Sequence, residues 1–126
     1  MRVLVIEPQK VPEVREIEDT FEVMQAIVGG YIQTLYPFED EVALVVNDEG
    51  KLLGLPLNRE LVTEDGTCYD IISGTFFIAG TPSNCDHFTS LTEEQIEKYS
   101  EMFAVPRMFL NLDGRIMILP MVEDCF

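Results

Sequence analysis

The sequence predicts a single compact α+β domain: one curved, mainly antiparallel sheet with two helices and a C-terminal β-hairpin. Short apolar runs recur between turn residues, and helix capping signals occur at about residues 19–29 and 92–103. A favoured hairpin turn divides residues 107–119. The chain has 126 residues, 47% of them hydrophobic, enough for a core without disulfide or metal support. We therefore treat residues 1–126 as one domain.

The N-terminal residues predict a buried strand followed by an edge strand. Residues 3–6 are all apolar, which is typical of a strand covered on both faces. Residues 13–17 read EVREI and suit an edge strand whose charges face solvent.

The first helix is predicted over residues 19–29. Asp19 is expected to cap it, with Glu22 three residues further on. Gly29 is expected to end it in the left-handed conformation. The apolar face that we expect to be buried consists of Phe21, Met24, Ile27 and Val28.

Residues 47–59 form the densest pattern in the sequence, and residues 47–55 within it predict a β-hairpin. Residues 42–46 are apolar and indicate a central strand. Residues 48–50 indicate the turn, with Gly50 at a positive φ, and residues 51–55 the returning strand.

The segments on either side of this pattern are shorter. Residues 31–38 predict a strand that ends at Pro37, and residues 58–61 predict one helical turn. Residues 69–79, with Gly74 among them, predict a further apolar strand.

The second helix, at residues 92–103, carries the clearest local signals. Thr92 is expected at the N-cap and Gln95 three residues later, which is a capping box. Its buried stripe is expected to consist of Ile96, Tyr99 and Phe103. After it, the pair Asp113–Gly114 between two apolar runs predicts a hairpin with a type I′ turn.

Four segments in this order resemble a known family: VGGYI at 28–32, NDEGKLLGLPLNR at 47–59, YDIISGTFFIAG at 69–80 and LTEEQIEKY at 91–99. The chain is identified by them as a member of a bacterial and phage family catalogued as domain of unknown function 3846, over about residues 1–103. The hairpin and tail, residues 104–126, lie outside the resemblance. The resemblance implies a setting among gut-type bacteria, phages and mobile elements, where accessory and anti-defence proteins occur. It brings no active-site residues with it.

The charge restricts the partners. The chain has 23 acidic and 8 basic residues, and its formal net charge is −15. The basic residues are scattered along the sequence: Arg2, Lys10, Arg15, Lys51, Arg59, Lys98, Arg107 and Arg115. This argues against direct nucleic-acid binding and against adsorption to an anionic membrane. The charge would attract a basic protein partner, or it serves only solubility.

The cysteines and the N-terminus predict a cytoplasmic protein. Cys68, Cys85 and Cys125 are odd in number and far apart, which suits reduced thiols. The first apolar run is too short for a signal peptide or a membrane span.

Metal and nucleophile chemistry have weak support in the sequence. Cys85, Asp86 and His87 are adjacent, but the paired ligand spacing of a zinc site is absent. Cys85 and the single histidine could form a reactive pair, although no catalytic motif surrounds them. We therefore expect neither a metal nor a cofactor, and a metal or hydrolytic enzyme is the third interpretation.

The best candidate for a ligand site is the pair Asn58 and Arg59, which follows Pro56 and is expected on a rigid turn. Arg59 either pairs with nearby carboxylates to fix the turn or binds an anionic or planar ligand through both arms of its guanidinium. Stacking surface for such a ligand would come from Tyr31, Tyr36 and Tyr69.

Two interpretations of function follow. The first is a non-enzymatic acidic interaction protein, an accessory protein of phage or mobile-element type that docks on a basic partner protein as an inhibitor or a DNA mimic. The alternative is a small-molecule or nucleotide binding domain that uses Asn58 and Arg59. In either case, the apolar hairpin at residues 107–119 is expected to cover the sheet or to join two copies of the chain.

Overall fold

The computed structural model describes residues 1–121, which contain two helices and nine strands. In chain order the elements are β1 (Arg2–Ile6), β2 (Glu13–Glu16), α1 (Phe21–Val28), β3 (Ile32–Leu35), β4 (Val42–Asn47), β5 (Leu57–Val62), β6 (Cys68–Ser73), β7 (Phe76–Gly80), α2 (Glu93–Met102), β8 (Arg107–Leu112) and β9 (Arg115–Pro120). No helix in this range is long and apolar enough to cross a membrane. The predicted class, α+β with mainly antiparallel strands and a C-terminal hairpin, is confirmed.

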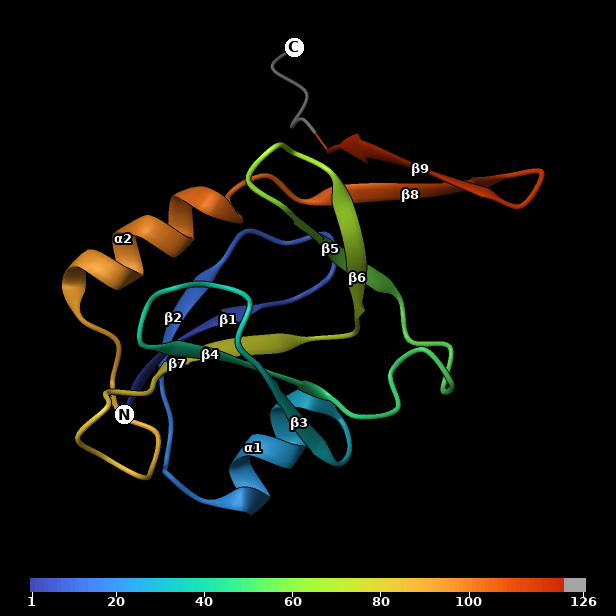
Figure 1. Cartoon of the computed structure of the whole chain (residues 1–126). Coiled ribbons are helices and arrows are strands. Elements are labelled where there is room, and N and C mark those ends of the chain that lie inside the picture. The colour runs from blue at the N-terminus through green and yellow to red at the C-terminus, as the bar shows by residue number, and fades with distance from the viewer. Residues whose placement is uncertain (122–126) are drawn as a thin grey trace, which may run out of the picture.

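The centre of the molecule is a five-stranded antiparallel sheet in the order β2-β1-β7-β4-β3. Helix α2 packs on one face and helix α1 on the other (Figure 1). The remaining strands form two separate pairs, β5-β6 and β8-β9, so the strands divide among three sheets. The β8-β9 pair projects from the body of the molecule (Figure 1).

The two-sided burial of the sheet explains the apolar runs in the sequence. In β4, Leu44 belongs to the core cluster that includes Tyr99 of α2. Its neighbour Val45 belongs to the cluster that includes Met24 of α1. Successive side chains of a strand point to opposite faces, so a sheet covered by helices on both faces needs an apolar residue at every position. The prediction of buried strands at residues 3–6 and 42–46 is confirmed.

The local signals of α2 and the hairpin are also confirmed. Thr92 Oγ1 accepts a hydrogen bond from the Gln95 backbone N–H at 3.1 Å, and the Gln95 side chain accepts one from the Thr92 N–H at 3.0 Å. Asp113 and Gly114 adopt φ values of 52° and 83°. Two consecutive positive φ angles are what a type I′ turn requires.

Helix α1 begins one residue later than predicted. Thr20, rather than Asp19, is the N-cap, and its hydroxyl accepts a hydrogen bond from the Val23 N–H at 3.2 Å. The prediction is wrong for Phe21, whose side chain is 69% exposed. Side chains in a first helical turn lean back past the N-terminus, so the ring of Phe21 is not directed onto the sheet. Gly29 ends the helix at φ 82°, as predicted.

The predicted hairpin at residues 47–55 is wrong. The Asn47 side chain accepts a hydrogen bond from the Glu49 N–H at 2.8 Å, and the chain then turns through two backbone bonds, from Leu53 N–H to Glu49 O and from Leu55 N–H to Gly50 O. The returning strand at residues 51–55 is therefore replaced by a coiled loop. Local hydrogen bonds of an Asn side chain compete successfully with strand pairing here.

The segments after this loop also differ from the predictions. Residues 58–61 belong to strand β5, not to a helical turn, and β5 pairs with β6. Gly74, at φ 84°, separates β6 from β7, which lie in different sheets. Residues 69–79 are therefore two strands, because a left-handed glycine breaks the extended backbone between them.

Candidate functional site

Asn58 and Arg59 lie inside the protein rather than on a presented turn. Both belong to strand β5, and their exposed fractions are 0% and 1%. The expected rigid turn is wrong because residues 57–62 pair with β6 over the α2 face of the core.

The guanidinium of Arg59 binds backbone and amide oxygens from three segments. Nε donates to Phe103 O at 3.3 Å and Nη2 donates to the same oxygen at 3.1 Å. Nη2 also donates to Lys10 O at 2.7 Å. Nη1 donates to the backbone oxygen and to Oδ1 of Asn58, at 3.2 and 2.9 Å. A guanidinium has five N–H groups, and these five bonds use all of them.

Arg59 supplies the positive charge at the C-terminal end of α2. Phe103 is the C-cap of α2, and the last turn of α2 contains no basic residue. The carbonyls at a helix C-terminus lack partners within the helix and carry partial negative charge. Burial lowers the pKa of Arg59 to about 10, and the nearby positive charge of Arg107 contributes to this shift.

Asn58 completes the buried network on the other side. Its Nδ2 donates to Ile6 O and to Gly74 O, both at 2.9 Å, while its Oδ1 accepts from Arg59. The pair thus ties β5 to the end of β1 and to the β6–β7 junction. Next to it, Arg107 donates from Nε to Glu60 Oε1 at 2.9 Å and anchors the base of β8 to β5.

The three tyrosines of the predicted site do not meet. Tyr69 lines the same cavity as Arg59, a hollow of about 950 Å³ beside the base of β8 and β9. Tyr36 lines a different cavity, on the α1 side of the molecule. Tyr31 lines neither of these and is 71% exposed.

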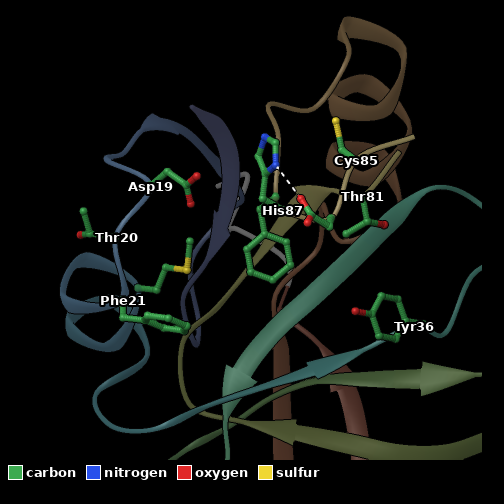
Figure 2. Close-up of a pocket in the computed structure, with 10 residues that line it drawn as sticks. Asp19, Thr20, Phe21, Tyr36, Thr81, Cys85 and His87 are labelled. Atoms are coloured by element: carbon green, nitrogen blue, oxygen red, sulfur yellow. Dashed lines mark hydrogen bonds and ion pairs between the residues drawn. The ribbon is translucent and has the colours of Figure 1, made fainter. Parts of the chain in front are cut away.

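Sequence reasoning missed the cavity that contains Tyr36. It has a volume of about 520 Å³, and three segments distant in the chain enclose it (Figure 2). They are the start of α1, the end of the β3 segment and the loop after β7. The lining residues are Asp19, Thr20, Phe21, Met24, Tyr36, Thr81, Cys85, Asp86, His87 and Phe88.

The Cys85, Asp86 and His87 group lies at this cavity but forms no catalytic arrangement in the described structure. Within residues 1–121, no group of three His, Cys, Asp or Glu side chains is placed to hold a metal ion. The His87 ring contacts Asp86 Oδ1 at 3.4 Å, and no hydrogen bond joins it to the Cys85 thiol. Figure 2 shows the sulfur of Cys85 directed away from the imidazole.

Helix α2 presents a dense acidic surface. Glu93, Glu94, Glu97 and Glu101 are all exposed, and we call these four residues the α2 acidic surface. Glu93 pairs with Arg2, whereas the other three have no ion-pair partner in residues 1–121. Glutamates four residues apart on a helix repel each other, so this arrangement costs helix stability.

The acidity continues into the β3–β4 connection beside α2. Glu39, Asp40, Glu94 and Lys98 line one hollow of about 540 Å³. Burial by itself raises the pKa of Asp40, but hydrogen bonds, chiefly from Tyr99 at 2.8 Å, outweigh it and hold this pKa below its usual range. Asp40 therefore stays ionised beside α2, and burial together with this bond raises the pKa of Tyr99.

Comparison with known proteins matches residues 1–104 to one family model, described as Domain of unknown function (DUF3846). No curated protein and no solved structure matches the chain. The match ends one residue after Phe103, so it covers both helices and leaves the β8-β9 hairpin outside. The resemblance drawn from the four sequence segments is thus confirmed, and the chain belongs to the DUF3846 family.

Proposed function

We propose that the protein is a non-enzymatic interaction protein that docks on a basic partner protein through the α2 acidic surface. The observation that carries this proposal is the set Glu94, Glu97 and Glu101, which is exposed and lacks ion pairs in the described residues. Such a surface repels itself in the free protein, and a basic partner would relieve that repulsion. The net charge of −15 would also speed the encounter.

In its more specific form, the proposal is that the surface imitates nucleic acid and blocks a nucleic-acid groove. Glu93, Glu97 and Glu101 follow one face of α2, and an α-helix places such residues about 6 Å apart along its axis. A regular row of negative charges is the feature that phosphate-binding grooves recognise. An accessory role in a phage or mobile element fits this activity.

Neutralising three charges of α2 should abolish capture of the partner. We expect wild-type protein to retain a basic protein from host lysate at about 0.01 M ionic strength and to release it at about 1 M, where the screening length is only about 3 Å. The triple variant Glu94→Gln, Glu97→Gln and Glu101→Gln should retain none. The measurement is affinity capture followed by mass spectrometry.

The matched control for this experiment removes the same charge elsewhere. Glu18, Glu49 and Glu64 are exposed and spread over other parts of the molecule. The variant Glu18→Gln, Glu49→Gln and Glu64→Gln should capture the partner as wild type does. Equal losses in both variants would show a general charge effect, and the proposal of an α2 docking surface would be abandoned.

A small-molecule or nucleotide binding domain is the second candidate function. The supporting observation is the hollow of about 950 Å³ that Arg59 and Tyr69 share. The guanidinium N–H groups are already bonded within the protein, so a ligand there would depend on Tyr69 and the other lining groups.

We also propose that two copies of the chain associate through the β8-β9 hairpin. Directly opposed residues share a face, so Met108 and Leu119, and Leu110 and Met117, lie on one side of it. All four are exposed, and an isolated two-stranded hairpin is only marginally stable in water. The hairpin carries two arginines and one aspartate, so its own charges do not add to the repulsion between two acidic chains.

Adjacent residues on opposite faces of β9 provide the test of association. Light scattering after size-exclusion chromatography should give the mass of a dimer for the wild type and of a monomer for Met117→Lys. Ile116→Lys adds the same charge on the other face and should remain dimeric. A wild-type protein that is monomeric at all concentrations would refute this mode of association.

We further propose that the protein works in the cytoplasm. Cys68 and Cys85 are exposed free thiols, which a reducing compartment preserves. Cys125, the third cysteine of the prediction, lies outside the described residues.

A further inference from the structure

The cavity beside α1 has the size and exposure of a binding site. Its volume of about 520 Å³ lies within the range of ligand pockets. Two aromatic rings at this cavity face solvent, since Phe21 is 69% and Tyr36 65% exposed. Figure 2 shows them on opposite sides of the hollow, with the loop that carries His87 between them.

The charges around this cavity have one sign. Asp19 and Asp86 contribute exposed carboxylates, and neither lysine nor arginine is among the lining residues. Asp86 makes only the long contact to His87, and Asp19 has no ion pair within residues 1–121. The site therefore combines exposed carboxylates with open aromatic faces.

This combination selects the chemistry of the occupant. Two carboxylates in a chain of charge −15 disfavour an anion. A bare metal ion would need a group of ligands that the described residues do not supply. An organic cation satisfies both features, because ammonium and guanidinium groups bind aromatic faces and carboxylates alike.

We propose that this cavity receives a basic side chain, an arginine above all, from the partner protein. A guanidinium is planar, so it stacks on a ring while its N–H groups reach a carboxylate. The rings of Phe21 and Tyr36 supply the stacking surface, and Asp86 the negative charge. The inference rests on the proposed function, since the side chain belongs to the basic partner that α2 attracts.

The single histidine provides a direct readout. His87 lines the cavity and is the only histidine of the chain, so its imidazole signals in an NMR spectrum have one assignment. Titration with N-acetyl-arginine amide should shift these signals and saturate. The citrulline analogue has nearly the same shape without the charge and should produce a much weaker response.

Two substitutions test the lining groups, each with the same probe. Tyr36→Leu and Asp86→Asn should each weaken binding of the arginine amide by about two- to fivefold. Tyr31→Leu is the matched control, because Tyr31 is as exposed as Tyr36 but does not line the cavity. It should bind the probe as wild type does, and so should the triple glutamine variant of α2.

The outcomes separate this inference from the proposed function. An absent response of His87, or an equal response to the citrulline analogue, overturns the inference, while α2-dependent capture of a partner would still support the proposed function. Tyr36→Leu and Asp86→Asn should also weaken capture of the partner. If these two variants bind the arginine amide weakly but still capture the partner fully, the cation that the cavity binds does not come from the partner protein. The inference is then wrong about the origin of the cation.

Discussion

We expect the Arg59→Met variant to lose about 3 to 5 kcal/mol of unfolding free energy. Methionine fills similar space but leaves the Phe103 and Lys10 carbonyls and the Asn58 amide oxygen without a donor. Each buried acceptor without a partner costs about 1 to 3 kcal/mol. Urea denaturation followed by circular dichroism measures the loss.

Two further variants show whether the hydrogen bonds, rather than the charge, stabilise the fold. Arg59→Lys keeps the charge but lacks the planar guanidinium that donates to both the Phe103 and the Lys10 carbonyls. We therefore expect it to recover less than half of the lost stability. Arg15→Met removes a surface arginine whose one ion-pair partner within residues 1–121 is Glu13, and should cost less than about 1 kcal/mol. Equal stability of Arg59→Met and Arg15→Met would contradict the structural role of Arg59.

The second large effect is expected at Gly50, where alanine should cost about 2 to 3 kcal/mol. A Cβ atom there would lie 2.7 Å from the backbone oxygen of Ser73, which is fixed at the end of β6. The buried position leaves no room for the β6 backbone to move away. Thermal unfolding of Gly50→Ala measures the effect as a lower Tm.

Gly54 in the same loop serves as the control, because its backbone conformation, and not a close contact, favours glycine there. Its φ is 69°, and nothing lies within 4 Å of the position that a Cβ atom would take. Asparagine tolerates that backbone conformation, so Gly54→Asn should cost little, whereas Gly50→Asn should be at least as harmful as Gly50→Ala. If Gly50→Asn were as stable as the wild type, the backbone conformation, and not the contact with Ser73, would be the reason for glycine at position 50.

Local signals in the sequence were sufficient for α2 and for the β8-β9 hairpin. A capping box and an Asp-Gly turn are both formed by residues within four positions of each other, so no distant contact is needed to interpret them. The two-sided strands were predictable for a similar reason, because burial on both faces leaves a continuous apolar run.

The choice of strand partner could not be predicted in the same way. β5 pairs with β6 instead of β4, since the Asn47 side chain turns the chain before a hairpin can form. Arg59 illustrates the same limit for the site. The oxygens that accept hydrogen bonds from its guanidinium belong to Lys10, Asn58 and Phe103, and no spacing in the sequence connects those residues.

The cavity beside α1 escaped prediction because three distant segments form it. One signal was available, since the only histidine lies beside a cysteine and an aspartate in one loop. The exposure of Phe21 could not be predicted, because helix α1 begins one residue later than the sequence indicated. The helical periodicity of the sequence placed the Phe21 ring in the core, so its position at the cavity was not predicted.

The pairing of β1 with β7 has a consequence for synthesis of the protein. Leu4 pairs with Ile78, so β1 and its neighbour β2 leave the ribosome well before β7, the partner of β1 on its other edge, is translated. Until then, the edge of β1 that faces β7 remains unpaired along the apolar run at residues 3–6, and such an edge aggregates or recruits chaperones. The sheet closes only when β7 enters between β1 and β4, and contacts this distant in sequence form slowly. Nascent chains that stall before β7 should therefore remain largely unfolded, whatever the quality of their helix caps.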